Sequence, residues 1–278
     1  MIDILLATYN GEKYLKQQID SILAQSNRDW QLSIRDDGSS DDTVKIIKDY
    51  VAKYSDKIRL IEDSSGRLGP ALNFGKLLEQ AAGNYVMFSD QDDIWLPNKI
   101  DLTLNAMRAS EKNYPNMPLL VHTDLKVVDA ELKPIADSLW NHNKICPDTG
   151  NDLKKLIYRN VVTGCAAMIN RKAVEISIPI PPQARLHDWW IALNVAKYGK
   201  IIYISTPTVL YRQHSQNIIG AKKTGRTNLA GLIRKLQQFK KQLSTDYQMI
   251  KKVYPPAKKS LLIAHRICLT ITKCLQLN

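Results

Sequence analysis

The sequence predicts an α/β protein built on an open, mostly parallel sheet flanked by helices, followed by a basic helical extension. Over residues 1–97, apolar runs of strand length alternate with amphipathic helical patterns. Turn residues or acids follow most of these runs directly. The positive charge excess is confined to the C-terminal end of the chain. Strands that alternate with helices are typical of a parallel sheet covered on both faces.

The elements of the first half follow one another in a regular order. We expect strands at residues 2–7, 30–35, 58–62 and 85–89, because each is a short run with buried-strand character. Helical spacing of apolar residues predicts helices over 15–23 and 44–54, and Pro70 opens a third helix that extends to Ala82.

After Pro97 the pattern is less regular. We expect a helix at 98–111, strands at 119–128, 161–169, 201–204 and 207–212, and a tryptophan-rich helix that begins near Asp188. From about residue 216 an apolar stripe with helical spacing runs through a lysine-rich segment as far as Ile250. Pro255 and Pro256 interrupt it, and a second apolar and basic helix is expected at 258–275.

The charge distribution separates a neutral body from a basic tail. Residues 222–278 contain 13 Lys and Arg against one acidic residue, whereas the rest of the chain contains 26 of each kind. A nucleic-acid-binding function is disfavoured, because the body offers no basic excess and the tail has few aromatic residues for stacking. Basic amphipathic helices suit an anionic membrane surface. Alternatively, the same helices pack on the body or form a homodimer.

Cysteine usage and the N-terminal segment indicate the compartment. The four cysteines form no CxxC pair, which favours reduced thiols over a disulfide framework or a zinc site. The opening segment MIDILLATYNGEKY has no basic region before its short apolar run, unlike a signal peptide. We expect a cytoplasmic protein that attaches peripherally to the inner face of the cell membrane.

Polar and acidic residues follow three of the predicted strands: 8–10, Asp36-Asp37 and 90–93. The carboxyl ends of parallel strands meet at one edge of a sheet, so these residues should gather there. Gathered carboxylates raise one another's pKa or require a cation. Carboxylate oxygens suit Mn²⁺ or Mg²⁺, often together with substrate phosphates. Each acid alone is more often a turn or helix cap, but their repetition at successive strand ends favours a site.

In order and spacing, these motifs together with Gly69 and Asn73 resemble family 2 glycosyltransferases of the GT-A fold over residues 1–215. The resemblance implies a Rossmann-like catalytic domain with a nucleotide-binding half at about 1–97 and an acceptor half at about 98–215. It implies a hexosyltransferase that moves a sugar from a nucleotide diphosphate to an acceptor hydroxyl with inversion. Residues 216–278 lie outside the resemblance and form the basic amphipathic tail.

The resemblance also assigns residues to the donor and the metal. Asp90-Gln91-Asp92 matches the DxD motif, whose last aspartate contacts the metal ion on the donor diphosphate. Asp37 matches the acid that hydrogen-bonds N3–H of the base, and Ala7, Thr8 and Tyr9 match the segment that lines the nucleoside. Arg67 departs from the family pattern, in which Asn is common, so the donor contacts of its loop remain open.

Asp188 is the candidate for general base. The acceptor hydroxyl is a poor nucleophile, and a positioned carboxylate is suited to take its proton. Asp188 falls where family members carry their catalytic acid, although an N-cap role is the structural alternative. Trp189 and Trp190 are candidates for stacking on the acceptor sugar, with core burial expected for at least one of them.

Residues 211–217, YRQHSQN, resemble the segment that closes over the donor in bacterial rhamnosyltransferases of polysaccharide biosynthesis. His214 is expected to complete the metal site with Asp90 and Asp92, or to donate to the diphosphate, with Arg212 nearby. The Gln-x-x-Arg-Trp signature of processive members is absent from the sequence, so the enzyme should add one or a few sugars. dTDP-rhamnose is the first expected donor and a UDP-hexose the alternative. The acceptor is expected to be a lipid-linked or cell-surface saccharide.

The enzymatic alternative is a phosphatase of the haloacid dehalogenase type, whose nucleophile also lies in a strand-end DxD. That motif normally follows the opening strand, whereas Asp90 follows the fourth. A phosphatase would also leave Asp37 and Asp188 without a role. Phosphate release from generic phosphoesters distinguishes the two classes.

Overall fold

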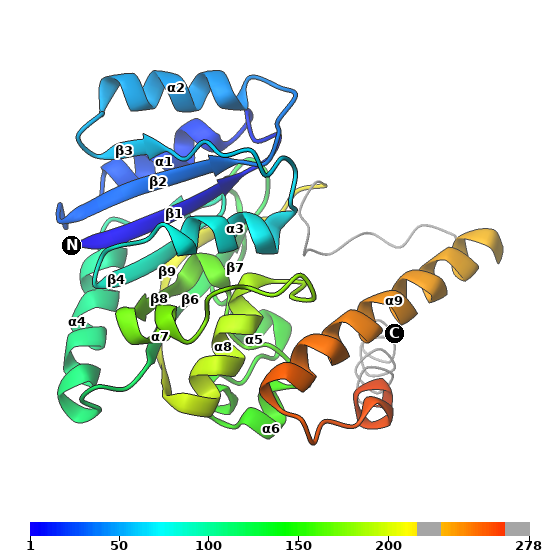
Figure 1. The fold of residues 1–278 in the computed structure, drawn as a ribbon. Helices are drawn as coiled ribbons and strands as arrows, with labels where there is room; N and C mark the ends of the chain where they lie inside the picture. Colours follow the sequence, from blue (N-terminus) through cyan, green and yellow to red (C-terminus); the bar gives the residue numbers. More distant parts are fainter. Residues whose placement is uncertain (216–228, 265–278) are drawn as a thin grey trace.

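The computed structural model describes residues 1–215 and 229–264, with side chains from residue 240 onward in the second range. Figure 1 shows a central sheet with helices on both faces and a long C-terminal helix that extends away from the body. The sheet runs through both halves of residues 1–215, because strands on either side of residue 97 pair with one another.

Within the described residues the sheet has nine strands in the order β3-β2-β1-β4-β8-β6-β9-β5, with β7 paired to β6. The first four strands in this order run parallel, and β8 lies antiparallel between β4 and β6. The strands are β1 Ile2–Thr8, β2 Trp30–Asp36, β3 Ile58–Leu60, β4 Tyr85–Ser89, β5 Ile94–Trp95, β6 Leu119–Val128, β7 Pro134–Ala136, β8 Ala167–Asn170 and β9 Lys200–Arg212.

Helices cover both faces of this sheet. The core on one face includes residues of α1, α2 and α4, and the core on the other face includes residues of α3, α6, α7, α8 and α9. The helices are α1 Leu15–Leu23, α2 Thr43–Lys53, α3 Pro70–Glu79, α4 Lys99–Asn113, α5 Leu139–Asn143, α6 Leu153–Leu156, α7 Arg171–Glu175, α8 His187–Tyr198 and α9 Leu229–Val253, with 3-10 turns η1 Pro147–Asn151 and η2 Gly164–Ala166.

Continuous apolar runs form the central strands because both faces of the sheet are covered. In β1, Ile4 and Leu6 pack towards α1, whereas Leu5 packs towards α3, and all three side chains are fully buried. Successive side chains of a strand point to opposite faces, so a doubly covered strand has no polar face.

Most of the predicted elements are confirmed, but the extents of three expected strands are wrong. The strand expected at 161–169 is only Ala167–Asn170, because residues 164–166 form the turn η2. The two strands expected at 201–204 and 207–212 are one strand, β9, whose pairing with β6 shifts register near Pro207. Of the helix expected at 258–275, residues 259–264 are helical and the remainder lies outside the described residues.

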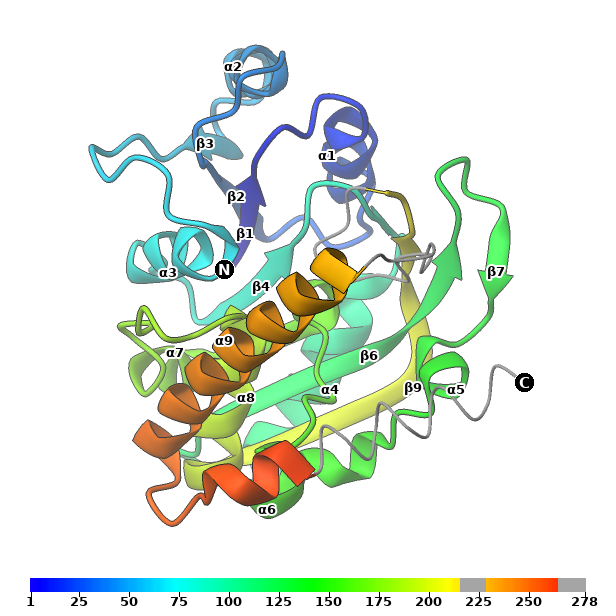
Figure 2. The same ribbon diagram turned by 90° about the vertical axis from the view of Figure 1, so that its right-hand side faces the viewer.

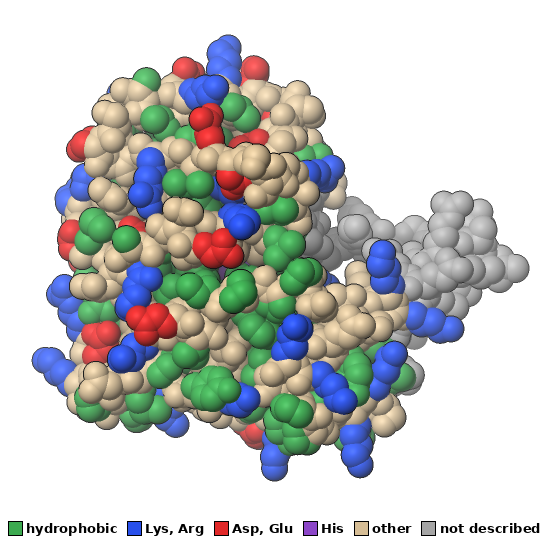
Figure 3. Space-filling view, in the orientation of Figure 1, with side chains coloured by type: hydrophobic (Ala, Val, Ile, Leu, Met, Phe, Trp, Pro, Cys, Tyr) green, Lys and Arg blue, Asp and Glu red, His purple; other side chains and the backbone are tan. Residues whose placement is uncertain are grey.

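The described half of α9 packs against the body. Leu243, Met249, Ile250 and Val253 are buried in the same core as α8, and the buried Asp246 pairs with Arg185 at 3.3 Å. Figure 3 shows Lys and Arg side chains around this part of the helix. Across residues 1–215 and 229–264, no helix has the length and hydropathy needed to cross a bilayer.

Candidate active site

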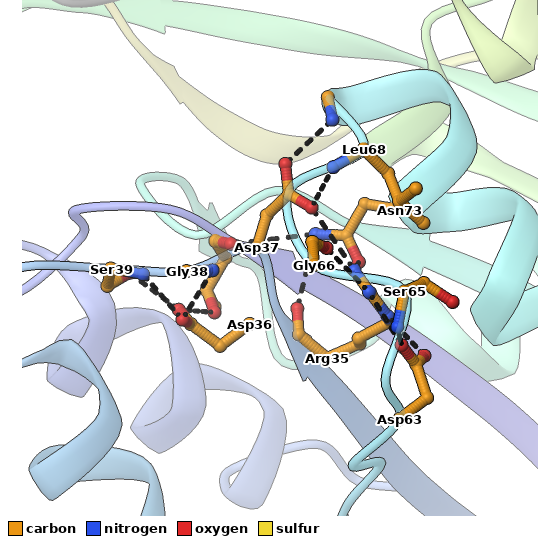
Figure 4. Close-up of polar contacts among 12 residues, drawn as sticks. Arg35, Asp36, Asp37, Gly38, Ser39, Asp63, Ser65, Gly66, Leu68 and Asn73 are labelled. Carbon is orange, nitrogen blue, oxygen red and sulfur yellow. Dashed lines mark hydrogen bonds and ion pairs between the residues drawn. The ribbon is translucent and has the colours of Figure 1, made fainter.

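The first acids of the site lie at the end of β2. Both Asp36 oxygens accept hydrogen bonds: Oδ1 from the hydroxyls of Thr8 (2.8 Å) and Ser39 (2.6 Å), and Oδ2 from the backbone N–H groups of Gly38 (3.0 Å) and Ser39 (2.7 Å). Gly38 has a φ of 83°, which favours glycine at this turn. Asp36 therefore ties the end of β1 to the turn after β2, and the buried Thr8 hydroxyl is used within the protein. Figure 4 shows the bonds of Asp36 to Gly38 and Ser39.

Asp37 fixes the loop that precedes α3. Its Oδ1 accepts from Leu68 N (2.7 Å) and from the Arg35 guanidinium (3.2 Å), and its Oδ2 accepts from Gly69 N (2.7 Å). The side chain is 5% exposed. Both Asp37 oxygens thus accept hydrogen bonds that hold this loop, and the role of Asp37 as partner of the base N3–H stays a prediction, because a carboxylate oxygen can accept more than one hydrogen bond.

Arg35 is the centre of this network, which Figure 4 shows. Its guanidinium binds both oxygens of Asp63 (2.7 and 3.0 Å) and donates to Asn73 Oδ1 (3.0 Å). Hydrogen bonding to Asp63 raises the pKa of Arg35 and holds the pKa of Asp63 well below its usual range. Asn73 is buried and its amide also donates to Arg35 O (3.2 Å). Asn73 therefore supports Arg35 from α3, and its role as a donor ligand stays a prediction.

An exposed aromatic–cation pair lies next to this network. The Arg67 guanidinium lies 4.0 Å from the centroid of the Tyr9 ring, and Tyr9 is 36% exposed. The Gln91 amide binds the backbone of Tyr9 on both sides, accepting from its N–H (2.8 Å) and donating to its carbonyl (3.0 Å). Gln91 thus positions Tyr9, the first residue after β1. Ala7, near the end of β1, is half-buried.

The acids at the end of β4 lie in a different environment. Asp93 is 1% exposed; its Oδ1 accepts from Arg212 N (3.0 Å), whereas its Oδ2 has no hydrogen-bond partner among the described residues. Burial raises the pKa of Asp90 to about 7, and the negative charges of Asp92 and Asp188 add to this effect. Burial raises the pKa of Asp93 well above its usual value, and the negative charges of Asp92 and Asp90 add to this effect. These carboxylates are poorly compensated within the described protein.

Two further buried groups lie beside these acids. Burial raises the pKa of the Cys165 thiol, and ligand atoms of Asp90, Asp93 and Cys165 all lie within 4.8 Å of one another. Burial lowers the pKa of Lys99 to about 8, and its Nζ has no hydrogen-bond partner among the described residues. Lys99 Nζ lies 4.7 Å from the Trp95 ring centroid.

His214 and Arg212 connect β9 to the DxD segment. His214 Nε2 lies 2.8 Å from Asp92 Oδ2, and its ring packs at 4.8 Å from the Tyr14 ring. Arg212 is 2% exposed and its guanidinium donates to Asp92 O (2.8 Å), Ala130 O (2.7 Å) and Gln17 Oε1 (2.7 Å). The Arg212 guanidinium therefore holds the DxD loop, and its role as a donor ligand stays a prediction.

Asp188 lies within the first turn of α8, not at its N-cap, which is Leu186. Its Oδ2 accepts from Gly164 N (3.0 Å) and its Oδ1 from the Asn160 amide (3.1 Å). A Cβ at Gly164 would lie 2.7 Å from His187 Nε2, so only glycine allows this close approach. Burial raises the pKa of Asp188 to about 6. The turn η2 replaces the expected strand here and brings the Gly164 N–H to the carboxylate.

The two tryptophans after Asp188 differ in exposure. Trp189 is 1% exposed and its Nε1 donates to Leu156 O (2.9 Å), so its ring has the core burial expected for at least one of the two tryptophans. Trp190 is half-buried and its Nε1 donates to Ser177 O (2.7 Å). His187 packs its ring 3.9 Å from Phe74, and burial lowers its pKa to about 3, which keeps it neutral.

Sequence reasoning missed Arg35, Lys99 and Asn160. Arg35 directly precedes Asp36-Asp37, and a basic residue beside an acid pair could have indicated an internal ion pair. Lys99 follows Pro97-Asn98 at a helix start, where a lysine is usually exposed, so its sequence contains no sign of burial. Asn160 lies in a loop without a recognisable motif.

The known proteins that this chain resembles agree with this architecture. A dTDP-rhamnosyl transferase, RfbG, of Shigella flexneri is 26% identical over 78% of this chain and 74% of its own length. A putative glycosyltransferase, EpsE, of Bacillus subtilis is 39% identical over 36% of each chain. An uncharacterized glycosyltransferase of Rickettsia felis is 27% identical over 82% of this chain, but the match spans only 36% of that protein.

Solved structures show the same fold. Staphylococcus aureus TarS 1–349 in complex with UDP-GlcNAc superposes with a TM-score of 0.60 at 18% identity, covering 94% of this chain and 69% of that one. The mannosyltransferase PcManGT of Pyrobaculum calidifontis, in complex with GDP-Man and Mn²⁺, gives a TM-score of 0.56 at 17% identity, covering 100% and 80%. The predicted GT-A architecture is thereby confirmed.

The family model of glycosyl transferase family 2 matches residues 3–176, which include β1, the acids after β2 and β4, and Asn160 and Gly164 beside Asp188. The chain spans about a third of the length of the Bacillus subtilis and Rickettsia felis relatives, 36% of each. It belongs to glycosyltransferase family 2.

Proposed function

We propose that the protein is an inverting, metal-dependent, non-processive enzyme that moves one sugar from a nucleotide diphosphate to an acceptor hydroxyl. The observation that supports this most is the proximity of the DxD acids to Asp188, whose charge contributes to the raised pKa of Asp90. Direct displacement at a sugar carbon requires a donor site and a base that lie close together, and both candidates lie at one edge of the sheet.

The residues at the end of β4 fit a divalent cation. Asp93 has an oxygen without a described partner, the pKa of Asp90 is raised, and Asp92 lies 2.8 Å from a His214 nitrogen. Such an anionic, oxygen-rich set suits Mn²⁺ or Mg²⁺. Asp90, Asp92 and His214 would hold the ion. When bound, the ion would neutralise negative charge on the leaving diphosphate, so no general acid is needed.

Asp188 acts as the base in this proposal. The Gly164 N–H and the Asn160 amide hold its carboxylate in one orientation. A pKa of about 6 leaves the group ionised at neutral pH while keeping it more basic than an ordinary aspartate. Asp188 takes the proton of the acceptor hydroxyl as that oxygen attacks the sugar carbon opposite the departing diphosphate, and attack from the opposite side produces inversion.

The first proposed donor is dTDP-rhamnose, and a UDP-hexose is the alternative. The likeness to the dTDP-rhamnosyl transferase RfbG supports the first, and the likeness to TarS in complex with UDP-GlcNAc supports the second. The Tyr9–Arg67 pair provides an exposed aromatic face and a positive charge beside the donor-binding segment. We propose that this pair contacts the nucleotide.

The tail is proposed to attach the enzyme to an anionic membrane that carries a lipid-linked saccharide acceptor. The basic excess of residues 222–278 supports this, and dimerisation through the same segment is the alternative. Lys240→Glu with Lys241→Glu, both exposed on α9, should abolish cosedimentation with anionic liposomes. The same charge change at Lys48 and Lys53 on α2 should leave cosedimentation intact. Equal binding by both double variants would contradict the membrane role.

A thermal-shift panel of nucleotide sugars with and without Mn²⁺ tests the transferase proposal. Only a true donor should raise the Tm in a metal-dependent way. Absence of any metal-dependent shift, together with rapid phosphate release from generic phosphoesters, would favour the phosphatase alternative instead.

A further inference from the structure

A pocket lies between α5 and β9, separate from the acids at the strand ends. Its volume is about 340 Å³. Its wall combines two aromatic rings with carboxylate, amide and hydroxyl groups, from Asp137, Ser138, Trp140, Asn141, Tyr203 and Ser205. None of the residues assigned above to the donor, the metal or the base lines it.

Packing on two sides fixes the orientation of the Trp140 ring. The ring centroid lies 5.3 Å from that of His122 and 5.9 Å from that of Tyr203, with an interplanar angle of 78° to Tyr203. Trp140 is 5% exposed, whereas Tyr203 is 40% exposed. Tyr203 therefore presents an accessible aromatic surface supported by a buried aromatic neighbour.

A buried carboxylate holds the helix that carries Trp140. Asp124 is 3% exposed and accepts hydrogen bonds from the Ser138 hydroxyl and from Trp140 N (3.2 Å). It lies where the register between β6 and β9 shifts, and such irregularities often re-aim a side chain next to a functional site. A helix of five residues would be marginal alone, so this anchor pre-organises the pocket wall.

The composition of the pocket suits a saccharide. A sugar ring presents C–H groups that pack on aromatic faces and hydroxyls that bind carboxylate and amide groups. Asp137 and Asn141 are exposed at the rim and can bind hydroxyls, beside the exposed Tyr203 ring. The pocket does not suit a phosphate, because no Lys or Arg lines it.

The pocket opens on the face of the sheet that carries Asp188. Leu120 and Ile201 belong to the core beneath α8, and His122 and Tyr203 follow them by two residues in the same strands. Residues two apart in a strand share a face. In Figure 2, α8 lies at the lower left of this view and α5 at its right, next to β9.

We propose that this pocket is an acceptor subsite, which binds a sugar unit other than the one that receives the transferred sugar. The inference rests on the proposed transferase function, because that reaction requires a saccharide acceptor near Asp188. A chain of several sugars on this face would place its terminal hydroxyl at Asp188 and an earlier unit against Tyr203.

The test uses the labelled full chain on an array of bacterial O-antigen and capsular oligosaccharides. The wild-type protein should bind oligosaccharides, and Tyr203→Ala should weaken binding about tenfold, as expected for an aromatic side chain at the centre of a binding site. Asp137→Asn, which retains the shape of the exposed side chain, should also weaken binding. Tyr198→Ala is the matched control, because Tyr198 is 52% exposed at the end of α8 and does not line the pocket.

A thermal shift by nucleotide sugars, measured on the same samples, separates the two proposals. A metal-dependent shift that is equal in wild type and Tyr203→Ala, with oligosaccharide binding lost only in the pocket variants, supports the subsite. Retention of oligosaccharide binding by Tyr203→Ala and Asp137→Asn, or no binding by the wild type, would overturn the subsite while leaving the transferase intact. If no nucleotide sugar raises the Tm of the wild-type protein, the proposed function itself is contradicted.

Discussion

The ends of β2 and β4 carry similar sequences, a group of aspartates directly after a buried strand, but the two groups have opposite surroundings. At the β2 end, every carboxylate oxygen of Asp36 and Asp37 accepts a hydrogen bond, and Arg35 pairs with Asp37. At the β4 end, one oxygen of Asp93 has no partner among the described residues, and the pKa values of Asp90 and Asp93 are raised. Satisfied acids stabilise the fold, and we expect poorly compensated acids to bind a ligand.

The largest expected effect follows from removing an acid at the β4 end. Asp92→Ala should reduce metal-dependent sugar transfer by at least about a thousandfold, since electrostatic stabilisation of a leaving group is commonly worth that much. Initial rates at several Mn²⁺ concentrations measure this. Asp36→Asn is the control at the β2 end and should keep the Mn²⁺ dependence of the wild type. Equal rates for Asp92→Ala and Asp36→Asn would show that the acids at the two strand ends do not differ in function.

Asp188→Asn should slow turnover by about 10²–10⁴-fold, the usual contribution of a general base, while nucleotide-sugar binding stays intact. Single-turnover rates and the nucleotide-sugar thermal shift separate the two effects. Asn160→Ala should cause a smaller loss, because the Gly164 N–H still orients the carboxylate. Normal turnover by Asp188→Asn would show that another group accepts the proton.

Removing an acid at the β2 end and removing one at the β4 end should change the stability of the protein differently. Asp37→Ala should lower the free energy of unfolding by about 3 kcal/mol, because it removes a buried partner of Arg35 and leaves two loop N–H groups without their acceptor. Asp93→Asn should leave the metal-free protein equally or more stable, because it removes a buried acid that lacks compensation. Urea unfolding of both variants measures this difference. Destabilisation of both by similar amounts would contradict it.

Much of the fold followed from local pattern, whereas the roles of charged residues did not. Continuous apolar runs identified β1, β2 and β4 because buried parallel strands have no polar face. The strand expected at 161–169 was wrong, because Val161 and Val162 are buried without pairing in the sheet and η2 follows them. Local sequence also cannot reveal that Asp37 binds Leu68 and Gly69, since that contact depends on how two distant segments meet.

The smallest expected effect is a pH dependence of stability. The pKa of Asp90 is about 7 in the folded protein against an ordinary value of 3.8, so the folded state binds more protons in this interval. Stability of the metal-free protein should therefore rise as pH falls from 8 to 5, relative to Asp90→Asn. For a domain of this size, each kcal/mol of difference in the free energy of unfolding changes the Tm by roughly 2–4 °C. Thermal unfolding across this pH range measures it, and parallel curves for the two proteins would contradict the raised pKa.

The central claim is that the acids after β4, and not those after β2, bind a divalent cation. The most direct measurement is a Mn²⁺ titration followed by electron paramagnetic resonance, in which bound Mn²⁺ loses the signal of the free ion. We predict that the wild type and Asp36→Asn bind Mn²⁺ with similar affinity and that Asp92→Asn does not. Equal binding by all three proteins, or no binding by the wild type, would contradict the claim.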